Sequence, residues 1–216
     1  MIKLENTKVM GWEPAIRGMR NPMNSWEKSD SYWTQLVDVE TTDFGDFEYF
    51  VGDNDHELMM RLAKGGPVHA KYRRMIVVYV DITAPLYWWK EFDTYKVGTV
   101  ANSCSTMHKI HAKEFTMDDF SCERMHAGGR RALEFTIDVL NVDREMFLKT
   151  NNKDYWDDMI QLLPSSYNQK RTIMLDYEVL VGMYQHRKNH KLKEWHVLCD
   201  WIKELPYSEV IIGEEK

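Results

Sequence analysis

The chain has 216 residues, of which 44% are hydrophobic and 12% aromatic. This composition excludes a disordered chain, and the length suffices for one sizeable core or at most two small ones. We expect a single domain over residues 1–216. The formal net charge of −6 provides no general attraction for phosphates, so we expect no duplex nucleic acid partner and place any anion site in a local pocket.

The sequence predicts neither a membrane-spanning segment nor a secretory signal peptide. No apolar run approaches the roughly 18 residues that span a bilayer, and the first residues lack the apolar core of a signal peptide. We therefore expect no membrane partner and a cytoplasmic location.

The cysteines and histidines do not form a recognisable framework. Cys104, Cys122 and Cys199 are odd in number and lack paired spacing, which argues against disulfides and a zinc module and favours reduced thiols. His108 and His111 could place two imidazoles on one helical face, but no third ligand has the usual spacing. We expect a surface segment there and no metal site.

The first quarter of the chain has weak patterns. Lys8–Trp12 is a candidate short strand, and Asn21–Trp33 is rich in Asn, Ser and charges, which favours an irregular connection. Acidic residues accumulate between Asp38 and Glu57, and a solvated face explains them more simply than a metal site, which would need carboxylates converging in space. They are Asp38, Glu40, Asp43, Asp46, Glu48, Asp53, Asp55 and Glu57.

Clearer elements follow. A helix is predicted over Glu57–Lys64, capped by Asn54 or Asp53 and ended by Gly65-Gly66-Pro67. The segment Met75–Ile82 contains a continuous apolar run typical of a strand buried on both faces, so it is the predicted central strand.

The stretch from Ala84 to Lys109 combines an aromatic helix with a run of small polar residues. It begins as an aromatic helix opened by Pro85 and ends at Gly98, which readily leaves helical backbone angles. A run of small polar side chains follows, with too few large apolar groups for a core, so it either decorates a surface or lines a polar pocket. Its members are Thr99, Asn102, Ser103, Ser105 and Thr106.

Helical patterns dominate the second half. Cys122–Thr150 has apolar residues at helical spacing, Trp156–Leu163 continues a second amphipathic piece before Pro164, and Thr172–Leu175 is a short strand. In the last helix the predicted buried stripe consists of Leu192, Trp195, Leu198, Cys199 and Ile202.

The stretch after Ala84-Pro85 resembles the signature of the flavin-dependent thymidylate synthases. In that family a helix after an Ala-Pro pair leads to Arg-His-Arg-x-x-Ser-x-Asn/Gln-Glu-x-Ser-x-Arg, a loop that holds deoxyuridylate beside the flavin. Here Thr94, Tyr95 and Lys96 stand where Arg-His-Arg would be, and Thr99 replaces the first serine.

The remainder of this motif matches if one residue is inserted. Asn102 then matches the Asn/Gln and Ser105 the second serine, while Ser103 replaces the Glu and Met107 the last arginine. Arginine offers a planar fork of donors for phosphate oxygens, and methionine and threonine do not. Lys96 keeps one point charge.

A second block of resemblance begins at Leu163-Pro164. In the family a Leu-Pro element leads through an arginine into a short strand and then a helix. Lys170, or Arg171 with a shift of one residue, falls at the phosphate-binding arginine, and Asp176 falls where an asparagine often meets the flavin.

The same block continues through a helix that ends Arg-x-x-x-His-Ala-Gln-x-Glu in the family. Arg187 matches the nucleotide-binding arginine, and His190 and Glu194 match the His and the Glu. His69 resembles in placement a histidine that precedes the central strand. A structural role stays open as an alternative to ligand binding for two of these residues. Arg187 could interact with the carbonyl dipoles at the end of a helix. His69 could be structural, as lone histidines more often are.

The resemblance implies a fold and an assembly. It covers roughly residues 69–109 and 163–206 and implies an α/β (α+β) chain with a central sheet and long helices. It also implies a homotetramer whose pockets form between subunits, which the aromatic and Met content suits.

The resemblance also implies ligands and site residues. The ligand would be a pyrimidine deoxynucleotide such as dUMP and the cofactor FAD, with methylenetetrahydrofolate and NADPH needed only if the family reaction is retained. Nucleotide binding is assigned to Lys96, Asn102, Ser103, Ser105, Lys170 and Arg187, of which Ser105 and Arg187 are the catalytic candidates. Cofactor binding is assigned to His69, Thr94, Tyr95, Asp176 and His190.

Because this chain lacks the arginines and the glutamate of the family signature, two alternatives to the family's catalytic activity stay open. One alternative is a non-catalytic protein that kept the fold and binds or sequesters a nucleotide. Another is an enzyme with an altered substrate, its pocket rebuilt around Asp93, Tyr95 and Lys96. A flavin absorption band in the purified protein would favour an enzyme, and a colourless protein that binds nucleotides would favour the first alternative.

Overall fold

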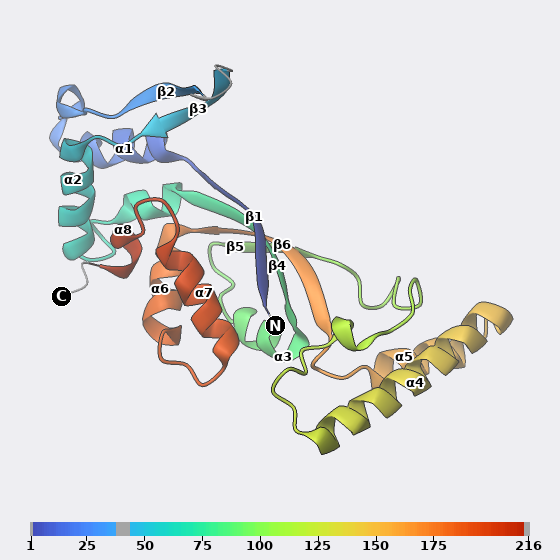
Figure 1. Ribbon diagram of the computed structural model, residues 1–216. Coiled ribbons are helices and arrows are strands. Elements are labelled where there is room, and N and C mark those ends of the chain that lie inside the picture. Colours follow the sequence, from blue (N-terminus) through green and yellow to red (C-terminus); the bar gives the residue numbers. More distant parts are fainter. Residues whose placement is uncertain (1, 38–43, 214–216) are drawn as a thin grey trace. The chain divides into compact units, whose positions relative to one another are not determined.

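The computed structural model describes residues 2–37 and 44–213. Within them four strands form one sheet in the order β1-β4-β6-β5, and two form a separate hairpin, β2-β3 (Figure 1). The sheet contains β1 (Lys3–Met10), β4 (Val77–Pro85), β5 (Thr99–Ser103) and β6 (Asn168–Asp176). This combination of sheet and helices confirms the predicted α/β (α+β) class.

The chain divides into two compact units. Unit 1 comprises Met1–Asn6, Val80–Lys96 and Val100–Ile173, and unit 2 comprises Thr7–Tyr79, Val97–Thr99 and Met174–Lys216. Each is described by itself below. The single domain expected from the sequence stays a prediction.

Strand β4 has neighbours on both sides, which confirms it as a central strand. The expectation that both of its faces are buried is wrong. Val78, Val80 and Ile82 are buried, whereas Tyr79 between them is 42% exposed. Because side chains alternate across a strand, this pattern marks one buried face and one partly open face.

Unit 2 begins with elements that the sequence patterns predicted only in part. The candidate strand at residues 8–12 is confirmed at residues 8–10, but β1 starts earlier at Lys3 and ends at Met10, and helix α1 (Trp12–Arg20) begins two residues later. Between them Gly11 has φ +95°, and a Cβ there would overlap the Met75 carbonyl oxygen. Only glycine fits this turn from strand to helix.

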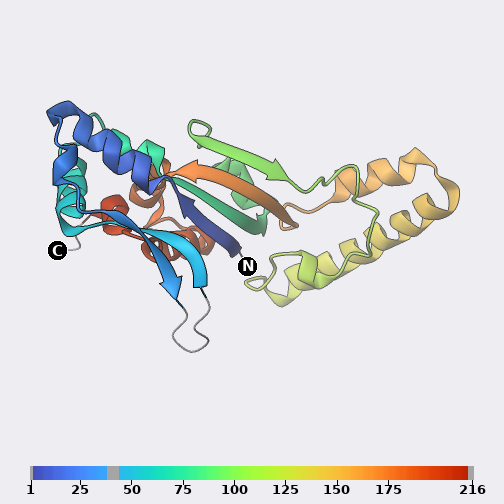
Figure 2. The same ribbon diagram turned by 90° about the horizontal axis from the view of Figure 1, so that it is seen from above.

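The connection after α1 is also more ordered than expected. It contains two short 3₁₀ turns, Asn21–Met23 and Trp26–Lys28, and leads into the hairpin of β2 (Tyr32–Val37) and β3 (Phe44–Phe50). Cross-strand aromatic pairs stabilise this hairpin, since the ring centroids of Tyr32 and Phe50 lie 5.3 Å apart. Figure 2 shows the hairpin from above.

Helix α2 (Asp53–Lys64) confirms the predicted helix but starts earlier, and the residue at its N-cap is Gly52, not Asn54 or Asp53. The cap comes from a distant side chain. The Asp30 carboxylate accepts hydrogen bonds from the backbone N–H groups of Asn54 (2.9 Å) and Asp55 (3.2 Å).

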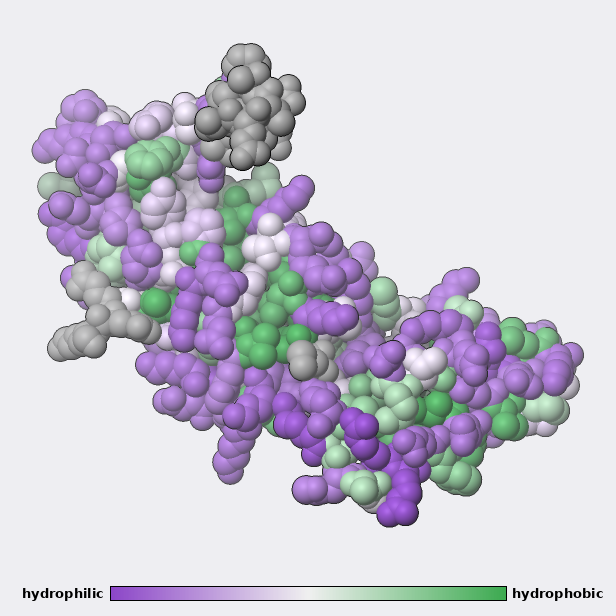
Figure 3. Space-filling view, in the orientation of Figure 1, coloured by the Kyte–Doolittle hydropathy of each residue, from purple (hydrophilic) through white to green (hydrophobic). Residues whose placement is uncertain are grey.

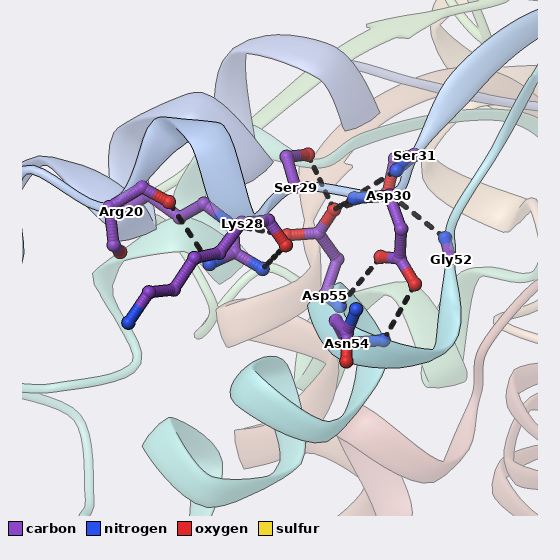
Figure 4. Close-up of polar contacts among 9 residues, drawn as sticks. Arg20, Lys28, Ser29, Asp30, Ser31, Gly52, Asn54 and Asp55 are labelled. Atoms are coloured by element: carbon purple, nitrogen blue, oxygen red, sulfur yellow. Dashed lines mark hydrogen bonds and ion pairs between the residues drawn. The ribbon is translucent and has the colours of Figure 1, made fainter.

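The acidic stretch is a solvated face only in part. Glu48, Asp53 and Glu57 are exposed as expected, and Asp38, Glu40 and Asp43 lie outside the described residues. Asp55 does not belong to a solvated face. It is fully buried, and its Oδ1 accepts a 2.6 Å hydrogen bond from Arg20 Nε (Figure 4). The arginine compensates the charge that burial would otherwise disfavour.

The aromatic helix in unit 1 is shorter than predicted. Helix α3 (Leu86–Phe92) follows Pro85, which is its N-cap, and ends well before Gly98. Trp88, Trp89 and Phe92 are its buried residues. The polar run after it is also not simply a loop, because its first part forms the edge strand β5, whose last four residues are exposed.

Two helices complete unit 1. Helix α4 (Ala127–Thr150) starts five residues later than predicted, and α5 (Lys153–Leu162) ends before Pro164 as expected. Leu133, Ile137 and Leu140 of α4 are buried in one hydrophobic cluster, which confirms the helical spacing read from the sequence. The opposite side of α4 exposes Phe135 (70%) and Val142 (60%), and Figure 3 shows apolar residues at the surface of this α4–α5 part.

The remaining helices belong to unit 2 and are α6 (Tyr177–Arg187), α7 (Lys193–Lys203) and α8 (Glu209–Ile212). The predicted stripe of the last helix is confirmed for Trp195, Leu198, Cys199 and Ile202, which are buried in α7. Its first member, Leu192, is instead the N-cap residue before α7 and is only half-buried. In the part of the chain that the structure describes, no helix is both long and apolar enough to cross a membrane.

Candidate functional site

The two sequence blocks meet in unit 1. Strand β5 of the first block lies beside β6 of the second. Just beyond β5, the Cys104 backbone N–H donates to the Lys170 carbonyl oxygen (2.9 Å), and Gln169 Nε2 donates to the Cys104 carbonyl oxygen (2.7 Å). The backbone therefore holds Asn102 and Ser103 next to the strand that carries Lys170.

Lys170 lies among carboxylates. Its Nζ is 3.2 Å from Asp81 Oδ2 and 3.6 Å from Glu5 Oε2. Asp81 also accepts hydrogen bonds from Thr172 Oγ1 (2.6 Å) and Asn6 Nδ2 (3.0 Å). The hydrogen bond from Thr172, followed by those from Asn6 and Lys170, lowers the pKa of Asp81 to about 2, so this carboxylate is ionised at neutral pH.

Arg171 makes a different set of contacts, because neighbouring side chains point to opposite faces of a strand. Its Nε donates to Gln169 Oε1 (3.0 Å) and its Nη1 to Asp93 Oδ1 (2.7 Å). The guanidinium carbon lies 4.2 Å from the centroid of the Trp89 ring, a cation–π contact. Lys170 and Arg171 are thus alternatives for a binding role, and one pocket on one face would use only one of them.

The residues at the Arg-His-Arg position follow α3. Thr94 is exposed and its hydroxyl donates to the Glu91 carbonyl oxygen (2.7 Å), while Tyr95 is partly buried. Lys96 is exposed, and no residue that the structure describes forms an ion pair with it. Lys96 is therefore the cation of this segment that could meet an anionic or carbonyl oxygen.

Ser105 closes the turn after β5. Its hydroxyl oxygen accepts hydrogen bonds from the backbone N–H groups of Met107 (3.2 Å) and His108 (2.9 Å). Asn102, Ser103 and Ser105 are all exposed. The Ser105 hydroxyl can still donate one hydrogen bond to a ligand.

A cavity of about 700 Å³ borders Lys170 within unit 1. It is large enough for a nucleotide-sized molecule. Its charged side chains are of both signs, namely Lys3, Lys113, Arg130 and Lys170 with Asp118, Asp119, Glu123 and Glu134.

In unit 2 the second block forms a cluster around one tryptophan. The Arg187 guanidinium carbon lies 4.5 Å from the Trp195 ring centroid, and the His190 ring meets Trp195 at 6.2 Å and 70°. Glu194, in the first turn of α7, is 2% exposed. Arg187 and His190 thus lie beside the same tryptophan ring, and Glu194 is buried next to that tryptophan in the sequence.

Asp176 stabilises the start of helix α6. It is the N-cap of α6, where its Oδ1 accepts a hydrogen bond from the Val179 backbone N–H (2.9 Å). Burial raises the pKa of this carboxyl, and the backbone hydrogen bonds only partly offset the effect. Gly98 approaches the cap closely, since a Cβ there would lie 2.9 Å from Asp176 Oδ2. The remaining candidate, His69, is exposed beyond the end of α2.

The comparisons with known proteins come from structure alone. No family model matches the sequence, and no curated protein matches it. Thymidylate synthase X from Helicobacter pylori, solved with FAD and dUMP, is similar at a TM-score of 0.68 and 15% identity over 99% of this chain and 98% of that one. A second structure of that enzyme gives 0.65 and 15% over 98% of both chains.

This chain has the thymidylate synthase X fold. A UMP/dUMP methylase, PolB from Streptomyces cacaoi, shares it at a TM-score of 0.60 and 11% identity, covering 97% of this chain and 93% of that one. At these identities the likeness establishes the fold, and it spans nearly the whole length of each protein.

Within the thymidylate synthase X fold, sequence reasoning missed two features near the candidate residues. One is Asp81, whose polar position inside the apolar run of β4 was a usable signal. The other is the set of contacts around Arg171. Strand alternation alone separates Lys170 from Arg171, but the carboxylates that meet them come from residues some 80 or more positions earlier, which no local pattern reveals.

Proposed function

We propose that this protein binds a pyrimidine deoxynucleotide of the dUMP type in a pocket like that of thymidylate synthase X, with FAD as the neighbouring cofactor. The observation that carries the proposal is the pairing described above. Two separate sequence blocks, found independently by their motifs, are joined through a hydrogen bond from Cys104 N–H to Lys170 O. Solved structures of the same fold contain dUMP and FAD.

The roles follow from exposure and charge. Lys96 and Arg187 would contact phosphate or carbonyl oxygens, and Asn102, Ser103 and Ser105 would hydrogen-bond the base or phosphate. We further propose that the protein is a homotetramer and that copies of the chain complete one another's pockets.

The residues fit FAD in part. Lys96 supplies an exposed cation, and the partly buried Tyr95 beside it supplies an aromatic ring. Asp176 is already used as the α6 cap, so a flavin contact there would have to share it. When bound, FAD would supply hydride chemistry, and the protein would contribute binding, orientation and electrostatics.

A second candidate is a protein that binds the nucleotide without turnover. The specific observation in its favour is the loss of signature charge, since Thr94 and Met107 cannot donate as arginines do, and the Lys170 and Arg171 charges are already compensated by carboxylates. Such a protein would keep the pocket but lack strong stabilisation of developing charge.

Calorimetric titration with dUMP tests the binding proposal. Lys96→Ala and Arg187→Ala should each weaken binding about tenfold or more, because a charge-assisted hydrogen bond is worth roughly 1.5–3 kcal/mol. Lys149→Ala is the matched control, since Lys149 is an exposed lysine on α4 that pairs with Glu145 of the same helix, and it should leave affinity unchanged. Unchanged affinity in both site variants would show that the pocket is elsewhere.

Two further measurements separate enzyme from binder. A visible flavin spectrum in the isolated or FAD-treated protein, together with release of the C5 proton of deoxyuridylate, would support turnover. Nucleotide binding without either would support the second candidate. An absence of binding to any pyrimidine nucleotide or nucleoside would refute both.

A further inference from the structure

Both cations of strand β6 already have carboxylate partners within unit 1. Lys170 lies within ion-pair distance of Asp81 and Glu5, and Arg171 is bonded to Asp93. Two positive charges are thus matched by three negative ones. A strand that was to hold a phosphate dianion would be expected to leave at least one cation uncompensated.

The carboxylates around Lys170 are held in place. Asp81 is only 18% exposed and is fixed by Thr172 and Asn6, so it cannot easily turn away from the ammonium group. Glu5 is 52% exposed and lies 3.6 Å from Lys170 on another side. A phosphate that contacted this ammonium group would therefore also lie near two carboxylates, whose repulsion opposes the attraction of the lysine.

The adjoining cavity does not change this balance. Its four basic and four acidic side chains cancel formally, and one of the basic ones, Lys113, is itself paired with Asp119. Within one copy of the chain, the side chains that line this cavity therefore provide no excess of positive charge to concentrate a dianion.

On the other face of β6, the Arg171 side chain is also already engaged in contacts within the protein. Its side chain is 15% exposed, stacked on Trp89 and bonded through Nε to Gln169. Asp93 is 50% exposed and occupies Nη1. It takes the position that an external oxyanion would need for a bidentate contact with the guanidinium group.

We infer that the β6 cations do not serve as a phosphate subsite, so that the protein recognises its pyrimidine ligand as a nucleoside and gains little from a 5′-phosphate. The inference rests on the proposed function, because it specifies which form of the ligand that pocket takes. Any contact that Lys96 or Arg187 makes with the ligand would then be with a carbonyl oxygen, and loss of either side chain should weaken nucleoside and nucleotide binding alike.

The test compares deoxyuridine with dUMP by calorimetric titration of the full-length protein. The unaltered protein should bind the two with affinities within about threefold of each other. Asp81→Asn, Glu5→Gln and Asp93→Asn each remove one compensating charge. At least one of them should raise the affinity for dUMP about tenfold while leaving that for deoxyuridine unchanged, and the responsive variant identifies the face involved.

Asp200→Asn is the matched control for a change of net charge, because Asp200 is an exposed carboxylate paired with Lys203 on α7. It should alter neither affinity. Glu5→Gln keeps the test valid if Asp81→Asn lowers stability, since Glu5 is half exposed and, among the residues that the structure describes, its carboxylate pairs with Lys170 alone.

Failure of the inference is distinguishable from failure of the proposed function. If the unaltered protein binds dUMP about a hundredfold more tightly than deoxyuridine, or if none of the three variants changes the ratio, the inference is overturned and the proposed function stands. If the unaltered protein binds neither ligand, the proposed function is overturned and the inference with it.

Discussion

Asp55 is the residue on which the first part of unit 2 depends. It is fully buried, and its carboxylate accepts hydrogen bonds from Arg20 and from the hydroxyl groups of Ser29 and Ser31 (2.6 Å each). Burial alone would raise the pKa of Asp55, but these hydrogen bonds and the arginine charge outweigh it and lower the pKa. One carboxylate thus joins α1, the start of α2 and the connection between them.

We expect Asp55→Ala to reduce the free energy of unfolding by about 3–5 kcal/mol, because it leaves the Arg20 charge buried without its partner. Denaturant unfolding followed by circular dichroism measures this. Asp55→Asn is the control, since it keeps the shape and some hydrogen bonds and should cost less. A loss below about 1 kcal/mol in the alanine variant would mean that water or a rearranged side chain compensates Arg20.

Asp81 makes the stability depend on pH. Its pKa is lowered on folding from 3.8 to about 2, so the folded protein holds the ionised form more strongly than the unfolded chain does. The resulting stabilisation is complete above pH 3.8 and disappears as the pH falls through about 2. Thermal melts at these two pH values should therefore show a smaller drop in Tm for Asp81→Asn than for the unaltered protein. Equal drops in both proteins would contradict this assignment.

Neither role was readable from the sequence. Asp55 was placed on a solvated face because it lies in a run of acids, and its partners lie 24 or more positions earlier in the chain. By contrast, the burial of Trp195 and Leu198 was predictable because helical spacing is a local property.

Among the elements, the segment between α3 and β5 passes close to the start of α6 at Gly98. This residue has φ +75°, and an added Cβ would lie 2.9 Å from both Asp176 Oδ2 and Val179 Cγ2. The backbone angle and the close approach both require glycine here. The predicted stop at Gly98 thus has a physical basis, although helix α3 itself ends at Phe92.

Gly98→Ala should accordingly lower the free energy of unfolding by about 1–3 kcal/mol. Gly182→Ala is the matched control, because Gly182 lies inside α6 and a Cβ there would meet nothing within 4 Å. It should stabilise the protein by up to about 1 kcal/mol. If both substitutions shift the denaturation midpoint in the same direction, the strain at Gly98 is not the determining factor.

Elements were predictable where one pattern determined them. The apolar run of β4 and the helical spacing of α4 identified a central strand and a core helix. The pairing of β2 with β3 was missed because Tyr32 and Trp33 lie at the end of a segment rich in Asn and Ser, and the stability of β2 comes from its antiparallel pairing with β3. Strand β5 was missed for a related reason, since its polar side chains lack an apolar alternation and its order comes from β6.

For the molecule as a whole, the exposed apolar side chains of α4 suit the proposed self-association. Phe135 and Val142 lie opposite the buried stripe of that helix and are more than half exposed. Both side chains lie on the same face of α4, where a second copy of the chain could cover them.

Light scattering coupled to size exclusion should give a mass of about 103 kDa for four chains of 25.7 kDa each. Phe135→Asp should lower that mass, because it places a charge in the apolar row, whereas Glu145→Gln on the same helix should not. A mass of one chain for the unaltered protein would remove the tetramer from the proposal. It would also require a pocket complete within a single copy.

Cys104 offers a practical advantage. It is exposed, while Cys122 and Cys199 are buried, and burial raises the pKa of Cys199 to about 11. A maleimide dye should therefore attach to one of the three thiols without any engineered change. Since the backbone of this residue links β5 to Lys170, the fluorophore would sit where the two sequence blocks join, and its emission would serve as a built-in reporter for screening pyrimidine ligands.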